Sequence, residues 1–185
     1  MDPSREKEII EEAKKNPESF GLIFDEYYRP IFRYILRRTA DIELAKDLTS
    51  ETFFKAFKNL GKFSWFKVPF SSWLYRIATN EANSAWRKKR KFIKVSLDNL
   101  PEISSKDNIA EEYAAAQEEI RNKEEFNLLH RKILKLNPAY QAVISLRFFE
   151  KKKIAEIGQI LEKPEGTIKA QLHRALKELR ELMEE

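Results

Sequence analysis

Residues 63–94 combine aromatic side chains with dense positive charge. All three tryptophans of the chain lie here, and residues 87–94 hold six Lys and Arg side chains with no acid among them. Aromatic rings stack on unpaired bases and cations bind phosphates, so this composition suits single-stranded or opened nucleic acid. By itself, the stretch is equally compatible with an aromatic-rich core helix that ends in a solvated basic tail.

If residues 71–90 form a helix, their side chains divide between two opposite faces. At 100° per residue, one face is apolar except for Glu81. The opposite face carries hydrogen-bond donors at steps of four, three, four and three residues, again without an acid. This donor row consists of Arg76, Asn80, Asn83, Arg87 and Arg90. A merely solvated face would normally mix charges of both signs, so the donor row favours nucleic-acid binding over the core-helix interpretation.

The segment before this helix, residues 61–70, is predicted to be a loop because Gly61, Ser64 and Pro69 interrupt regular structure. It nevertheless carries four aromatic side chains: Phe63, Trp65, Phe66 and Phe70. Apolar residues in a loop either pack beneath it or contact a ligand.

A helix is predicted from about Asp41 to Leu60, with Gly61 as its C-cap. Its buried stripe is expected to consist of Leu44, Leu48, Thr52, Phe53, Ala56, Phe57 and Leu60. The other face is by default a solvated surface, and it shows Asp47, Ser50, Glu51, Lys55 and Lys58.

The C-terminal part of the chain has the pattern of a helix-turn-helix. Residues 154–161 and 166–183 are predicted helices joined by a short turn, and the small Ala155 and Gly158 would let them pack closely. Backbone N–H groups at the start of the second helix are placed to meet phosphates in a major groove. Its outward side chains are expected to be Lys169, Ala170, His173, Arg174 and Lys177. A structural helical hairpin with a charged face is the alternative.

Composition limits the remaining possibilities. The 185 residues include only four glycines and many Lys and Glu, which favours an all-α fold. The formal charge of +5 favours phosphate-bearing partners. The absence of cysteine excludes thiolate zinc sites, and the two histidines lie far apart, so we expect no metal and no cofactor.

The N-terminus lacks the apolar core of a signal peptide and no stretch could span a membrane, which fits a cytoplasmic protein without membrane insertion.

Three motifs together resemble a known family. Residues 47–57 (DLTSETFFKAF) resemble the segment with which group 4, or extracytoplasmic-function (ECF), sigma factors of the sigma-70 family bind core RNA polymerase. Residues 70–80 (FSSWLYRIATN) resemble the family's −10 promoter segment. Residues 154–157, 166–169 and 172–175 resemble its −35-reading helix-turn-helix. The motifs follow one another in the family's order and spacing.

The resemblance implies two small helical domains joined by a flexible linker. Residues 1–93 would form the region 2 helical bundle, residues 94–112 the linker, and residues 113–185 the region 4 helix-turn-helix. It implies a promoter-specificity subunit without enzymatic activity, which binds the clamp and flap of bacterial core RNA polymerase, melts the −10 element and reads duplex −35 DNA. An anti-sigma factor would control it, and a flipped non-template base would sit in a pocket of the loop.

Three sets of site residues follow from the resemblance. The −10 element would contact the donor row together with Phe63, Trp65, Phe66, Phe70 and Trp73. The −35 element would contact Gly166, Thr167, Lys169, Ala170, His173, Arg174 and Lys177. Core polymerase would contact Asp47, Ser50, Glu51, Phe54 and Lys55. Ser50 stands where the family often has Gln, and the loop is more aromatic than usual.

Parts of the sequence are also compatible with two other functions. A self-standing DNA-binding regulator would use the helix-turn-helix but would leave the first domain without a task. A nuclease or helicase accessory would need a metal or a general base, and Asp47 and Glu51 stand one turn apart without a third ligand placed by the sequence.

Overall fold

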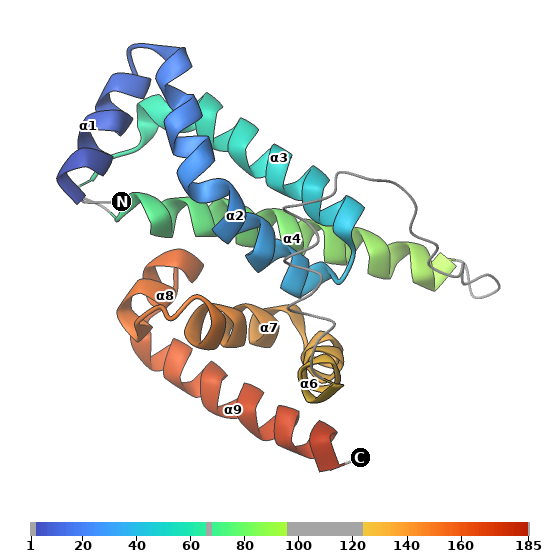
Figure 1. The fold of residues 1–185 in the computed structure, drawn as a ribbon. Helices are drawn as coiled ribbons and strands as arrows, with labels where there is room; N and C mark the ends of the chain where they lie inside the picture. The colour runs from blue at the N-terminus through green and yellow to red at the C-terminus, as the bar shows by residue number, and fades with distance from the viewer. Residues whose placement is uncertain (1–2, 66–67, 96–123, 185) are drawn as a thin grey trace.

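The computed structural model describes residues 3–65, 68–95 and 124–184, and every regular element in these ranges is helical (Figure 1). The first half of the chain contains α1 (Pro3–Ala13), the 3₁₀ turn η1 (Pro17–Ser19), α2 (Phe20–Thr39), α3 (Ile42–Asn59), the 3₁₀ turn η2 (Leu60–Lys62) and α4 (Phe70–Val95). The second half contains α6 (Glu124–Lys135), α7 (Pro138–Ile144), the π-helical turn η3 (Ser145–Phe149), α8 (Ile154–Leu161) and α9 (Glu165–Glu184). The predicted all-α fold is confirmed, whereas the predicted linker, residues 94–112, lies outside the described residues beyond Val95.

In the first half, α2, α3 and α4 pack against one another and α1 packs against α2. Helix α3 begins where the Asp41 side chain accepts a hydrogen bond from the Leu44 N–H at 3.0 Å. The predicted stripe of α3 is buried at Phe53 and Ala56, but Phe57 is 42 % exposed. The C-cap prediction is also wrong, because Leu60 occupies that position and the chain continues as η2.

In the second half, α8 and α9 form the predicted helix-turn-helix. Glu162 ends α8 in the left-handed conformation, with φ 54°, and Pro164 immediately precedes α9. The Lys163 N–H donates to the Gly158 carbonyl at 2.9 Å, which draws the turn tightly against the helix. A Cβ atom at Gly158 would lie 2.9 Å from the Lys163 carbonyl oxygen. The expected close packing is therefore confirmed at Gly158, where the contact is with the turn, but not at Ala155, which is exposed.

Gly158→Ala is expected to destabilise the chain. Overpacking against a backbone atom costs about 1–3 kcal/mol, which exceeds the roughly 1 kcal/mol that alanine gains over glycine in a helix. Thermal unfolding followed by circular dichroism measures the change. Gly21→Ala on α2 is the matched control, because a Cβ atom there meets nothing within 4 Å. Equal melting temperatures for the two variants would contradict the packing argument.

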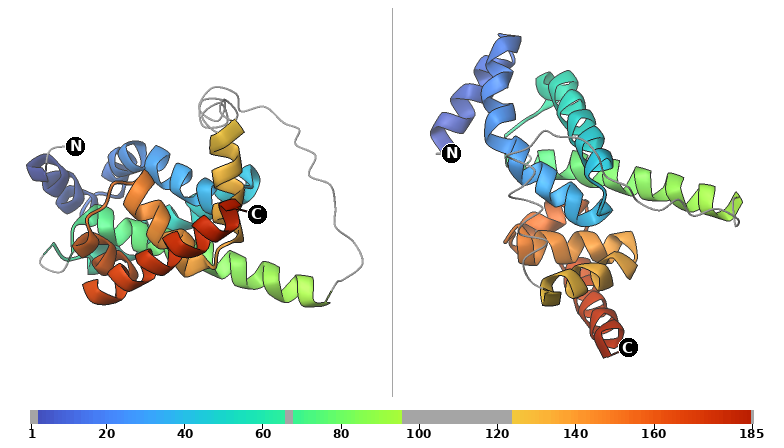
Figure 2. Two further views of the ribbon diagram at one scale, coloured as in Figure 1. Left: turned by 90° about the horizontal axis from the view of Figure 1, so that it is seen from below. Right: turned by 45° about the vertical axis from the view of Figure 1, so that its right-hand side comes forward.

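The two halves lie against each other (Figures 1 and 2). Helices α7 and α8 contact α4, and α6 and η3 contact α2. Leu146 and Ile157 belong to the same continuous cluster of buried side chains as Phe70 and Tyr75. The C-terminal part of α4 projects beyond the rest of the molecule (Figure 2). Nothing in the sequence predicted this packing of the halves.

Candidate nucleic-acid interface

The loop between η2 and α4 turns aromatic side chains inward at both ends. Phe63 and Phe70 are buried, and their rings meet edge to face with centroids 5.2 Å apart. The Phe63 ring also contacts Trp65 and Trp73, at centroid distances of 5.3 and 5.2 Å. Phe63 and Phe70 thus support the loop from beneath, which corrects the expectation that they contact DNA themselves. Phe66 lies outside the described residues.

The turn that follows α1 anchors this loop through Lys14. Lys14 Nζ donates a hydrogen bond to the Phe63 carbonyl oxygen at 3.2 Å and lies 5.8 Å from the centroid of the Phe63 ring. The same ammonium group pairs with Glu11 at 2.7 Å. No local pattern in the sequence predicts this contact, because Lys14 and Phe63 are 49 positions apart.

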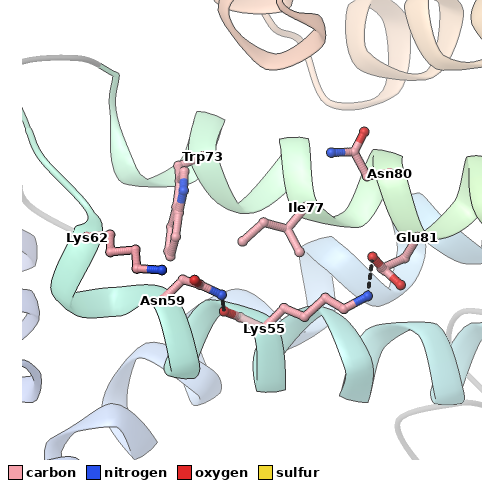
Figure 3. A pocket seen from close by; sticks show the side chains of 7 residues that line it. All are labelled: Lys55, Asn59, Lys62, Trp73, Ile77, Asn80 and Glu81. Carbon is pink, nitrogen blue, oxygen red and sulfur yellow. Dashed lines mark hydrogen bonds and ion pairs between the residues drawn. The ribbon is translucent and has the colours of Figure 1, made fainter.

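A pocket of about 340 Å³ lies between α3 and α4 next to the loop (Figure 3). Trp73 and Ile77 extend from α4 towards α3, and Asn80 lies at the opposite side of α4 (Figure 3). The remaining lining residues are Lys55, Asn59, Lys62 and Glu81. The volume is at the lower end of the roughly 300–1,000 Å³ found for ligand pockets. An indole face, amide groups and the Lys62 ammonium group suit a single base with its phosphate.

An ion pair closes one end of this pocket. Lys55 Nζ lies 2.8 Å from Glu81 Oε1 and 3.2 Å from Glu51 Oε1 (Figure 3). The hydrogen bond to Glu81 raises the pKa of Lys55, so its ammonium group stays charged. Lys55 therefore turns towards α4 and the pocket, whereas the sequence had placed it with the polymerase-facing residues of α3. Glu81, which the sequence placed on the apolar face, is drawn into the same pair.

The donor row does not form one uniform surface. Asn80 and Arg87 are exposed. Asn83 is half-buried, and its Oδ1 accepts a hydrogen bond from Arg38 Nη2 at 2.6 Å. Arg76 is half-buried. Its Nη1 pairs with Glu162 and its Nη2 donates to the Gln159 carbonyl, both in the second half of the chain. The side chain of Arg90 lies outside the described residues.

The outer face of α3 is exposed and combines acids with aromatic rings. Asp47, Ser50 and Glu51 are exposed, and Phe54 shows 59 % of its surface. Phe57, one turn further on, adds a second exposed ring to this face. The helical periodicity had predicted Phe57 in the buried stripe, and its exposure corrects that prediction.

The residues predicted to face outward on α9 are exposed to solvent, except for the half-buried Ala170. Its N-terminal turn is exposed at Gly166 and Thr167, and the N–H groups of Thr167 and Ile168 both bond to the Pro164 carbonyl. The first N–H groups of a helix have no acceptor within it and are available to a phosphate. Further along the same face Ala170 is half-buried, and the exposed members are Lys169, His173, Arg174 and Lys177.

The described residues hold no group of three or more His, Cys, Asp or Glu side chains that could bind a metal ion. Among the same residues, no helix combines the length and the apolar character needed to cross a membrane.

Comparison with known proteins matches both halves. The family described as Sigma-70 region 2 matches residues 23–92, and the family described as Sigma-70, region 4, matches residues 126–179. The ECF RNA polymerase sigma factor SigW of Bacillus subtilis (strain 168) is 30 % identical over 182 residues, which cover 97 % of either chain. The chain belongs to the ECF sigma factors. This membership supports the sigma-factor interpretation over a self-standing regulator.

Further relatives agree with this assignment. The sigma factor is 30 % identical to the ECF RNA polymerase sigma factor BldN of Streptomyces coelicolor over 98 % of its own length and 67 % of that protein. Its fold resembles the sigma factor RpoE of Bartonella quintana, solved with the anti-sigma factor NepR, with a TM-score of 0.68, 18 % identity and coverage of 90 % of this chain and 98 % of that one. It also resembles CnrH, solved with the cytosolic domain of CnrY, with a TM-score of 0.63, 19 % identity and 95 % coverage of both chains.

Proposed function

We propose that this sigma factor acts in the cytoplasm as a non-enzymatic subunit that directs core RNA polymerase to promoters with two DNA-binding surfaces. The observation that carries this proposal is the presence, on one chain, of a base-sized pocket beside α4 and a separate cationic face on α9. A pocket beside exposed donors suits unpaired DNA, and an exposed helix face suits a duplex major groove.

At the −10 element, the pocket between α3 and α4 would receive a flipped non-template base. Extruding a base costs a few kcal/mol, which stacking and hydrogen bonds to its edge must offset. Trp73 supplies an indole face, and the amide residues Asn59 and Asn80 belong to the pocket lining. Phe63 and Phe70 would hold the loop in place from the core, and Arg87 would contact the phosphate backbone.

At the −35 element, α9 would lie in the major groove. Arg174 and Lys169 can donate to guanine O6 and N7 or to phosphates, and His173 lies between them on the same exposed face. The Gly166 N–H group and the Thr167 side chain would contact a backbone phosphate.

Core polymerase would bind the outer face of α3. Interfaces are enriched in aromatic residues at their centres, with polar groups at their rims. Phe54 and Phe57 would form the centre, and Asp47, Ser50 and Glu51 the rim. An anti-sigma factor would compete for these faces, in keeping with the solved relatives RpoE and CnrH, whose structures contain NepR and part of CnrY.

Transcription by core polymerase plus this protein on a randomised promoter library tests the proposal. Wild-type protein is expected to select two conserved elements. Asn80→Ala is expected to lower the yield and relax selection at one position of the −10 element, while binding to core polymerase remains unchanged. Ser84→Ala, one turn further along α4 and outside the pocket lining, serves as the control. No promoter-directed transcript with wild-type protein would refute the proposed function.

A further inference from the structure

Lys14 joins the turn after α1 to the loop that precedes α4. Its Nζ donates a hydrogen bond to the Phe63 carbonyl oxygen at 3.2 Å and lies 2.7 Å from Glu11 Oε1. The Lys14 side chain is only 20 % exposed, so it lies against the protein. The segment that matches Sigma-70 region 2 begins at residue 23, so Lys14 lies outside the family match.

The backbone at Lys14 is held by buried and capped neighbours. The Lys14 N–H bonds to the Ile10 carbonyl at 3.1 Å, and both Ile10 and Ala13 are buried in the core. Just beyond, the Asn16 side chain accepts a hydrogen bond from the Glu18 N–H at 3.2 Å, which starts η1. Because the root of the Lys14 side chain is fixed in this way, its ammonium group can fix the group that it contacts.

The group that Lys14 contacts is the last one before the loop. Phe63 follows η2, and its N–H donates to the Leu60 carbonyl at 3.0 Å while its own carbonyl accepts from Lys14. The buried Phe63 ring packs on Trp65 and Trp73, with centroids 5.3 and 5.2 Å away. The bond from Lys14 therefore sets the direction in which the chain enters the loop.

Two lining residues of the pocket between α3 and α4 adjoin this anchor. Lys62 precedes Phe63 in the chain, and Trp73 contacts the Phe63 ring (Figure 3). If the Phe63 carbonyl turned away from Lys14, both neighbours would shift with it. A misplacement of about 1 Å in a binding group is enough to weaken a site substantially.

We infer that Lys14 is a positioning residue for base selection at the −10 element. It acts without touching DNA: it holds the Phe63 carbonyl, and thereby keeps Lys62 and Trp73 where a flipped base would meet them. The exposed ion pair with Glu11 contributes little by itself, so the hydrogen bond to Phe63 is the contact that matters. This inference rests on the proposed function, but its first test measures the free protein alone.

The first experiment measures how accessible the loop tryptophans are in the free, full-length chain. In a Trp86→Phe background, Trp65 and Trp73 are the remaining tryptophans, and both are half-buried. Lys14→Met keeps the apolar stem but removes the ammonium group, so acrylamide quenching of their fluorescence is expected to increase. Lys14→Arg can donate to the same two oxygens and is expected to restore the wild-type quenching.

Two control variants separate the anchor from changes in charge and in stability. Lys15→Met removes the same charge from an exposed neighbouring position and is expected to leave quenching unchanged. Asp41→Ala removes the side chain that caps α3 at the end remote from the loop, so it is expected to lower the melting temperature without increasing quenching. Circular dichroism verifies the helical content of each variant. If Lys14→Met does not fold, Lys14→Gln replaces it and is expected to change quenching in the same direction.

The second experiment repeats transcription from the randomised promoter library with Lys14→Met. Loss of a hydrogen bond from a charged donor lowers the fraction of molecules with a correctly placed loop, so discrimination between bases at one −10 position is expected to fall about fivefold or more. Selection at the −35 element and affinity for core polymerase should not change. Lys14→Arg is expected to restore base selection, and Lys15→Met and Asp41→Ala are expected to retain it.

The salt dependence of promoter binding distinguishes positioning from a phosphate contact. Removing a lysine that binds a phosphate weakens binding evenly across sequences and decreases the salt slope by about one. Lys14→Met is expected to leave the slope unchanged. A slope that decreases by about one, with base selection intact, would make Lys14 a phosphate contact and overturn the inference.

The outcomes separate this inference from the proposed function. Unchanged quenching in Lys14→Met would overturn the anchor, and increased quenching with unchanged base selection would overturn its positioning role. Increased quenching, without any promoter-directed transcript from the wild-type protein and core polymerase, would support the anchor and refute the proposed sigma function.

Discussion

Arg174→Ala in the assembled polymerase is expected to weaken binding to −35 duplex DNA by about 1–3 kcal/mol, or roughly 5- to 150-fold, if the guanidinium group is bidentate to guanine. The side chain is exposed on the outer face of α9, so the loss should appear in DNA binding and leave the melting temperature unchanged. Equilibrium binding to duplexes with single base-pair changes measures the effect. A specific contact would relax selection at one base pair.

The salt dependence of binding separates the two possible roles of Arg174. If the side chain contacts only a phosphate, affinity should fall evenly across all duplexes and the salt slope should decrease by about one. Arg180→Ala is the matched control, because Arg180 is exposed on the same helix beyond the predicted contact residues. Equal affinities for the two variants would place Arg174 on an ordinary solvated face.

Phe54→Ala is expected to weaken binding of the sigma factor to core polymerase by about 2 kcal/mol or more, roughly 30-fold. A ring that is 59 % exposed in the free chain can be buried on binding, and aromatic anchors at interface centres dominate binding energies. A surface substitution of this kind usually changes folding stability by less than about 0.5 kcal/mol. Titration of labelled sigma factor with core polymerase, in the absence of DNA, isolates this contact.

The control for Phe54 is Phe148→Ala on η3, which removes a ring of similar exposure, 52 %, from the other half of the chain. Its affinity for core polymerase should remain within about threefold of wild type, as expected for most residues outside a binding centre. A loss in Phe148→Ala as large as that in Phe54→Ala would refute the special role of α3.

The surfaces of α9 and α3 were largely predictable from the sequence. When only one side of a helix is covered, the 3.6-residue period and the residue types are enough to tell its buried face from its exposed face, with little information from the tertiary structure. Lys169, His173 and Arg174 point outward as expected, and Phe53 and Ala56 are buried as expected. Phe57 is the exception, because it lies at the boundary of the stripe, where burial depends on how far the neighbouring helix extends over it.

The proposed −10 site was predictable only in part. Helix α4 is covered by α2, by α3 and by the second half of the chain, and a helical period cannot say which element covers a face. Asn83 is consequently bonded to Arg38, and Lys55 is drawn to Glu81 across the pocket. The loop aromatics Phe63 and Phe70 are buried because side chains of α2 and α4 and the turn after α1 pack on them, which their spacing in a loop does not reveal.

The sequence by itself determined the helical class and, through three motifs in order, the family, because these depend on local period and residue type. Only the tertiary structure decided that Arg76 is held by Glu162 and that Glu150 bridges Arg37 and Tyr75. Those partners are separated by 75 to 113 positions. Contacts of such separation are fixed by the packing of whole helices, and no local pattern encodes them.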